Sequence, residues 1–267
     1  MMPIFIRAIR DRKISLFAYC VIGIGLLWLY IALFPSIQAS SAQLEKLFQS
    51  YPKGLYQALG VQELSFNTIE KFLAVELFSF MWPILAITFA LSRAGGTIAG
   101  EIEKGTMGLF LSLPISRLKL FLAKYSSELF SILVFTIFTV ISIIPLTALY
   151  GESADVMVIL KLSILSFLFM WSIFAASMFL SALFSERSKV YMIMGGALLI
   201  MYAANVLASL KPSLSWLHKG SIFYYYNAQD ILTKDIVRIS FIIIIVGIVI
   251  LFTAIGAWTF SKRDIIS

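Results

Sequence analysis

The chain has 267 residues, of which 60% are hydrophobic and 13% charged, and its formal net charge is +7. Soluble domains are about 45–50% apolar and about 25% charged, so a soluble globular fold is excluded, and disorder is excluded because it requires low hydrophobicity. The composition predicts a polytopic membrane protein.

The chain begins with a segment expected to lie on the membrane surface. In residues 1–15, Phe5, Ile6 and Ile9 fall on one helical face and basic residues on the other, a pattern typical of interfacial helices. Basic residues before an apolar run also resemble a secretion signal, but this run has full spanning length and no small-residue cleavage site follows it. We therefore expect a retained interfacial helix that leads into the first span.

Six apolar stretches are long enough to cross the membrane, since a spanning helix needs about 20 mostly apolar residues. They are residues 16–35, 70–92, 120–149, 156–184, 190–209 and 238–260. Apolar positions within 36–69 predict short packed helices between the first two spans. The predicted fold is an all-α polytopic membrane protein with a single transmembrane domain.

The basic residues orient the spans. Membrane proteins carry excess Lys and Arg on their cytoplasmic segments. If the N-terminus is cytoplasmic, thirteen of the 21 basic residues fall on that side: Arg7, Arg10, Arg12, Lys13, Arg93, Lys104, Arg117, Lys119, Lys124, Arg187, Lys189, Lys262 and Arg263. This distribution predicts that both termini are cytoplasmic, and an even number of spans agrees, because it places the two termini on the same side. The positive charge thus indicates membrane orientation rather than nucleic-acid binding.

The cytoplasmic link between spans two and three is the most distinctive segment. Gly105 is expected to end the helix that continues from span two, and Thr106 to cap a new short helix. Pro114 limits that helix, and Ser116 can cap the third long helix. Leu109, Phe110 and Leu113 would form an apolar face on the short helix, which from these residues alone could also simply rest on lipid.

No motif for covalent chemistry is present. The sequence has neither a phosphate-binding P-loop nor a dinucleotide-binding glycine motif. Its one histidine, His218, and one cysteine, Cys20, are far apart, which argues against a metal site or a catalytic cluster. We expect no enzymatic activity and no cofactor bound by this chain itself.

The cytoplasmic link resembles the signature of a transporter family. Glu-x-Glu-Lys-Gly-Thr from Glu101, followed by Leu-Ser-Leu-Pro-Ile-Ser-Arg from Leu111, is similar to the type-two permease subunits of ABC transporters. In that family the segment is a coupling helix that docks on the ATP-binding subunit. The resemblance places this role on Glu101, Glu103, Gly105, Thr106, Leu109, Leu113, Pro114 and Arg117.

The resemblance also implies partners. It implies a separate ATPase subunit that binds ATP and Mg²⁺, because this chain carries no fused ATPase. It further implies a second permease chain, as a homodimer or a heterodimer, within the lipid bilayer. The expected location is a prokaryotic plasma membrane.

Three polar residues within the spans are candidates for the substrate path. Ionisable groups in a membrane are costly and therefore suggest function. Glu76 lines the path or lies at the outer interface, and Glu128 faces the inner vestibule or pairs with Lys124 at helical spacing. Asn205 either binds the substrate or forms a hydrogen bond between helices.

Four aromatic residues precede the last span. Phe223, Tyr224, Tyr225 and Tyr226 fit an aromatic belt at the interface. The family resemblance instead suggests a short re-entrant helix that closes the exit, and the two interpretations are compatible.

The sequence therefore predicts the permease subunit of an ATP-driven ABC exporter. ATP hydrolysis on the partner would drive an amphipathic or hydrophobic substrate, such as a lipid, drug or peptide, across the membrane. The alternative is a secondary transporter or channel that needs no ATPase, although such proteins often show repeated halves and broken helices.

Overall fold

The computed structural model describes residues 2–40 and 67–264, and every regular element in that part of the chain is a helix. The short helix α1 (Met2–Asp11) is followed at Arg12 by the long helix α2 (Lys13–Ala39). The short helices expected within 36–69 fall largely on residues 41–66, outside the described residues. The all-α prediction is confirmed for the described chain.

The second span is built from three successive helices. Thr68 caps α5 (Ile69–Leu73), its side chain accepting a hydrogen bond from the Lys71 N–H, and a π-helical stretch, η1 (Ala74–Met81), leads into α6 (Trp82–Thr97). Pro83 has no N–H to donate to the preceding turn, which favours a change of helical register at this point. The Ser79 hydroxyl donates to the Ala74 carbonyl over 2.7 Å within the π-helical stretch.

The third span joins α9 (Arg117–Ile141) to α10 (Ile143–Leu149), with a break at Ser142. Two short helices, α7 (Ala99–Glu103) and α8 (Met107–Leu111), connect it to the second span. The fourth span is α11 (Val156–Leu183), whose first N–H groups are capped by Asp155, and the fifth is α12 (Arg187–Leu210).

The chain then turns back through three short helices before the last span. These are η2 (Pro212–Gly220), α13 (Ile222–Tyr225) and α14 (Ala228–Lys234). The last span is α15 (Ile239–Lys262). Six helical segments of the described chain are therefore long and apolar enough to cross a membrane, as predicted. The largest difference in their bounds is at the end of span two, predicted at residue 92 and observed at Thr97.

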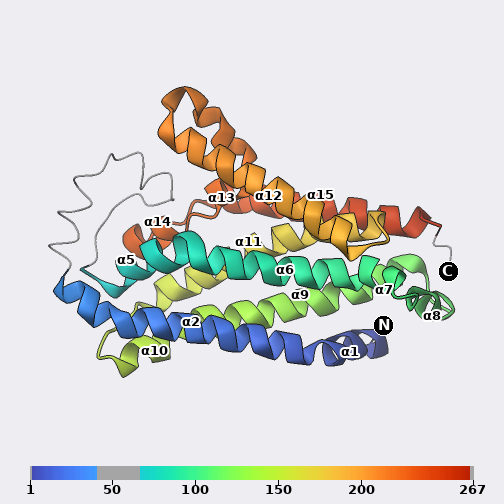
Figure 1. Cartoon of the computed structure of the whole chain (residues 1–267), viewed down its shortest axis with the longest axis horizontal. Coiled ribbons are helices and arrows are strands. Elements are labelled where there is room, and N and C mark those ends of the chain that lie inside the picture. Colours follow the sequence, from blue (N-terminus) through green and yellow to red (C-terminus); the bar gives the residue numbers. More distant parts are fainter. Residues whose placement is uncertain (1, 41–66, 265–267) are drawn as a thin grey trace.

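α11 forms the centre of the bundle and packs against α6, α9 and α15 (Figure 1). In the second and fourth spans, 56% of an apolar 18-residue stretch is buried. The corresponding share is 22% in the first span and 17% in the fifth and sixth. The apolar surfaces of α2, α12 and α15 are thus available to lipid or to another chain. α1, α7, α8 and the end of α15 lie together at one end of the bundle, called here the α8 end (Figure 1).

Candidate functional site

The α7–α8 segment is firmly joined to the bundle. The helix bends at Ile98, and the Ser181 hydroxyl of α11 accepts hydrogen bonds from the N–H groups of Ala99 at 3.0 Å and Ile98 at 3.3 Å. These N–H groups would otherwise be left without a partner in a buried position, which is costly. The bend that redirects span two into α7 is therefore stabilised by the central helix.

The turn after α7 forms at Gly105, as predicted. Gly105 has a φ of +70°, a left-handed conformation that glycine adopts without steric cost. The prediction that Thr106 caps α8 is wrong, because its side chain makes no capping bond. Its hydroxyl instead bonds the Glu101 carboxylate, and its N–H donates to the Glu101 carbonyl over 2.9 Å. A charged oxygen is the stronger acceptor, so this bond closes the turn between the two helices.

α8 and the turn that follows it each present one apolar side chain outward. Leu109 is 67% exposed and Leu113 42% exposed, while Phe110 turns inward, with its ring centroid 3.9 Å from the Lys124 Nζ. The single apolar face expected for these three residues is therefore divided between bundle and surface. α8 ends at Leu111, before Pro114, and the Ser116 hydroxyl caps α9 by accepting a bond from the Lys119 N–H, both as predicted.

Two ion pairs connect α7 to other spans. The Glu101 carboxylate lies 3.6 Å from the Lys124 Nζ on α9. The Glu103 carboxylate lies 3.5 Å from the Arg187 Nε and also accepts the Arg187 backbone N–H over 3.1 Å, at the start of α12. These two pairs join α7 to α9 and to the start of α12.

Arg117 connects the helix ends on the other side of α8. Its guanidinium donates to the Arg263 carbonyl just after α15. Arg263 in turn donates to the carbonyls of Ala182 at 2.9 Å and Phe184 at 3.0 Å, at the end of α11, where cations are favoured. Burial lowers the pKa of Arg263 from its ordinary value. These bonds hold α9, α11 and α15 together at the α8 end.

Behind this segment lies a buried cluster of charges. The two Glu128 oxygens lie 3.3 Å from guanidinium nitrogens of Arg12 and Arg93. The two arginines also bond each other's backbone, Arg12 donating to the Arg93 carbonyl over 3.0 Å and Arg93 to the Arg12 carbonyl over 3.2 Å. Of the interpretations left open for Glu128, the structure shows an ion pair, but its partners are these arginines, and Lys124 pairs with Glu101 instead.

Sequence reasoning missed Arg12 and Arg93 as functional candidates. Arg93 was counted only as a marker of orientation, although its side chain is 2% exposed. A signal was available: Arg93 near the end of span two and Glu128 in span three lie toward the same membrane face, and opposite charges inside a membrane are expected to pair.

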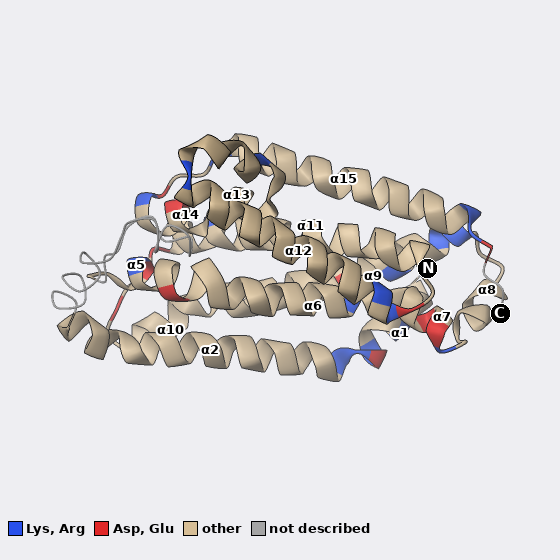
Figure 2. Ribbon diagram, turned by 45° about the horizontal axis from the view of Figure 1, so that its top comes forward, with Lys and Arg blue, Asp and Glu red and all other residues tan. Residues whose placement is uncertain are grey.

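The remaining path candidates lie away from this cluster. Glu76 is half-buried in η1, which directly follows α5, and α5 lies near the end of the bundle opposite α8 (Figure 2). The Asn205 side chain lies 2.7 Å from the Nδ1 of His218, and so joins α12 to η2 rather than to another span. The structure thus does not bring Glu76, Glu128 and Asn205 together.

The four aromatic residues before the last span point into the bundle. Tyr226 stacks on Phe169 with a centroid distance of 4.3 Å and on Trp82 at 5.9 Å. Tyr225 donates its hydroxyl to the Lys219 carbonyl over 2.8 Å. Tyr225 and Tyr226 are buried, Phe223 and Tyr224 are half-buried, and burial raises the pKa of both buried tyrosines. The rings of Tyr226 and its partners therefore pack the residue after α13 against α6 and α11.

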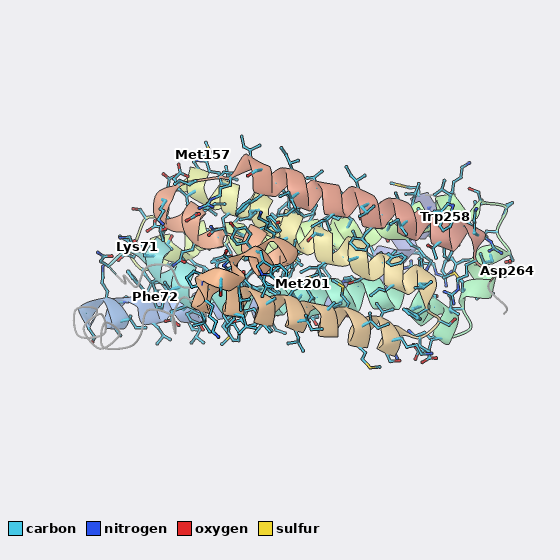
Figure 3. The ribbon with its side chains drawn as sticks, turned by 90° about the horizontal axis from the view of Figure 1, so that it is seen from above. Lys71, Phe72, Met157, Met201, Trp258 and Asp264 are labelled. Carbon is cyan, nitrogen blue, oxygen red and sulfur yellow. The ribbon has the colours of Figure 1, made fainter. Side chains whose placement is uncertain are left out.

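A large apolar cavity lies between α11, α12 and α15. It has a volume of about 310 Å³, and Ile173, Leu198, Met201 and Phe252 are among its lining residues. In Figure 3, α11 lies between α12 and α15, and Met201 marks the position of this cavity. Within residues 2–40 and 67–264, no group of three or more His, Cys, Asp or Glu side chains could hold a metal ion.

Comparison with known families decides the class of protein. Residues 5–265 match the family described as ABC-2 family transporter protein. The chain belongs to this family. It is therefore a multi-pass membrane permease subunit of an ABC transporter, and such membership implies association with an ABC ATPase subunit. No curated protein matches the sequence.

Proposed function

We propose that this permease couples ATP hydrolysis on a separate subunit to the export of an amphipathic or hydrophobic substrate. The observation that carries this proposal is the α7–α8 segment, which combines an exposed apolar surface with rigid links to three spans. ATP and Mg²⁺ would be bound by the partner ATPase, and both termini and α8 would be cytoplasmic.

Leu109 and Leu113 supply the docking surface in this proposal. Leu109 on α8 and Leu113 in the turn after it are both exposed and can fill a hydrophobic groove of a partner, as in the recognition of helices by grooves. Gly105, Thr106 and Pro114 fix the two turns that hold α8 across the end of the bundle. The partner would therefore bind a preformed segment, with little ordering cost.

The links behind α8 would carry the movement. ATP binding would draw two ATPase subunits together, and each would move the α8 docked on it. α7 follows α6 directly after the bend at Ile98, and Glu101 and Glu103 pair it with α9 and α12. Such a movement would bias the bundle between two arrangements, as in other rigid-body transitions.

The substrate path would lie between this permease and a second permease chain, identical or different. The weakly buried surfaces of α2, α12 and α15 support assembly with another chain. The apolar lining of the cavity beside α11 supports a hydrophobic cargo such as a lipid, drug or peptide. Glu76 and the α13 aromatics would act at the exit.

The test is copurification with the partner ATPase, followed by ATP-dependent transport in proteoliposomes. Leu109→Asp should reduce ATPase association at least about fivefold, because it places a charge in a desolvated groove at a cost of about 1–3 kcal/mol or more. Trp216→Asp is the matched control, since Trp216 is 64% exposed on η2 at the opposite end. Retention of both association and transport by Leu109→Asp would contradict the docking assignment. Transport by the chain alone without ATP would favour a secondary transporter.

A further inference from the structure

A second pocket at the α8 end is strongly basic. It has a volume of about 200 Å³ and lies where α2 and α12 begin and α6 ends. Four cationic side chains line it: Arg12, Arg93, Lys104 and Arg187. Figure 2 shows basic residues at the starts of α2 and α12. Among the described residues, no carboxylate lines this pocket, which we call the basic pocket.

The charges of the basic pocket are only partly compensated. Glu128 is shared between Arg12 and Arg93, and Glu103 pairs with Arg187. Neither carboxylate belongs to the lining of the pocket. These two negative charges compensate two of the four cations, so a net charge of two positive units remains. Lys104 has no ion pair within the described residues. An anion in the pocket would complete this charge balance.

Unused hydrogen-bond donors face the same space. The Nε of Arg93 is buried and has no acceptor within the described residues, and its side chain is 2% exposed. The hydroxyls of Ser15, Ser92 and Tyr191, which also line the pocket, have no partner in that part of the chain. The Arg93 Nε is too enclosed to meet a ligand in the pocket, so the donors available there are the three hydroxyls and the cationic side chains.

The position of the basic pocket along the bundle favours a ligand group that lies at the membrane surface. Its walls are the ends of three spans, which mark the level of the lipid headgroups. It is also open, because 49% of the Arg187 side chain is exposed. Glycines at positions 96 and 100 leave room beside the arginines, and a Cβ at Gly96 would lie 2.5 Å from the Arg12 guanidinium.

We propose that the basic pocket binds a phosphate group, as carried by the headgroup of an anionic phospholipid. Arginine and hydroxyl donors suit phosphate oxygens, and basic pockets between spans on the cytoplasmic side are known recognition sites for anionic lipids. A bound phosphate would join α2, α6, α7 and α12. It would thereby stabilise the arrangement of spans next to the α7–α8 segment.

The test uses the purified full chain in detergent micelles that contain phosphatidylglycerol, phosphatidylcholine, or phosphatidylcholine with inorganic phosphate. We expect phosphatidylglycerol to raise the unfolding temperature and to copurify, and Lys104→Gln to weaken its binding about fivefold, the effect of one surface cation on anionic lipid. Lys119→Gln is the matched control, an exposed lysine at the same end but outside the pocket.

The outcomes separate the possible sources of the phosphate. Stabilisation by phosphatidylglycerol alone, reduced by Lys104→Gln and by Ser92→Val, supports a lipid headgroup. Stabilisation by inorganic phosphate with the same dependence supports a soluble phosphate in the same site. Equal binding of phosphatidylglycerol and phosphatidylcholine, or equal effects of Lys104→Gln and Lys119→Gln, would overturn the proposal.

Discussion

The carboxylate of Glu128 offers the sharpest test of how the α8 end is held together. Glu128→Ala would leave two guanidinium groups facing each other, one of them, on Arg93, only 2% exposed. Removing one partner of a buried ion pair costs about 3–5 kcal/mol, because the remaining charge is buried without compensation. Arg12 is 25% exposed and therefore contributes the smaller part, since solvent screens it. We expect the free energy of unfolding in mixed detergent micelles to fall by about 3 kcal/mol or more.

Two further variants test the cause of this loss. Asp11→Ala breaks the pair between Arg7 and Asp11, whose side chains are 61% and 58% exposed, and should change the free energy of unfolding by less than about 1 kcal/mol. Glu128→Leu combined with Arg93→Met removes the buried charge as well as its partner, and should be more stable than Glu128→Ala. If Glu128→Ala were as stable as Asp11→Ala, the reasoning about the buried cluster would be refuted.

Three other predictions address the turn, the coupling links and pH. Gly105→Ala should lower the free energy of unfolding by about 1–2 kcal/mol, because φ is +70° there; unchanged urea or detergent unfolding would contradict this. Glu103→Arg should uncouple ATPase activity from transport. Adding Arg187→Glu should restore the coupling, since the ion pair can form again with its charges reversed. If the double variant stayed uncoupled, this ion pair would not be the link. Burial lowers the pKa of His218 below 6.5 in the folded chain. As the pH is lowered, the unfolded chain therefore takes up a proton before the folded chain does. The contribution of His218 to the free energy of unfolding should be constant above about pH 6.5 and fall below it. His218→Gln should remove this dependence in unfolding measured across pH.

The sequence was informative wherever one local property decides the structure. The lengths of the apolar stretches predicted six spans, Gly105 predicted a turn and Ser116 predicted a helix cap. Each of these features depends only on residues that are neighbours in the sequence. The partners of Glu128 were not predictable in the same way. Helical spacing offered Lys124, four residues away, whereas Arg93 lies 35 residues away and meets Glu128 only once two spans pack together. Likewise Thr106 had a suitable position for a cap, but the nearby Glu101 carboxylate is a better partner for its hydroxyl.

The sharing of Glu128 also bears on how the protein is made. Spans enter the membrane in chain order, and Arg93 arrives at the end of the second span, before the third span brings Glu128. Until then the long Arg93 side chain must reach the headgroup region to remain hydrated. We expect Arg93 to withdraw from water only when the third span supplies Glu128, which Arg12 shares in the folded structure. On this reasoning the first three spans assemble as a unit that one acidic residue completes.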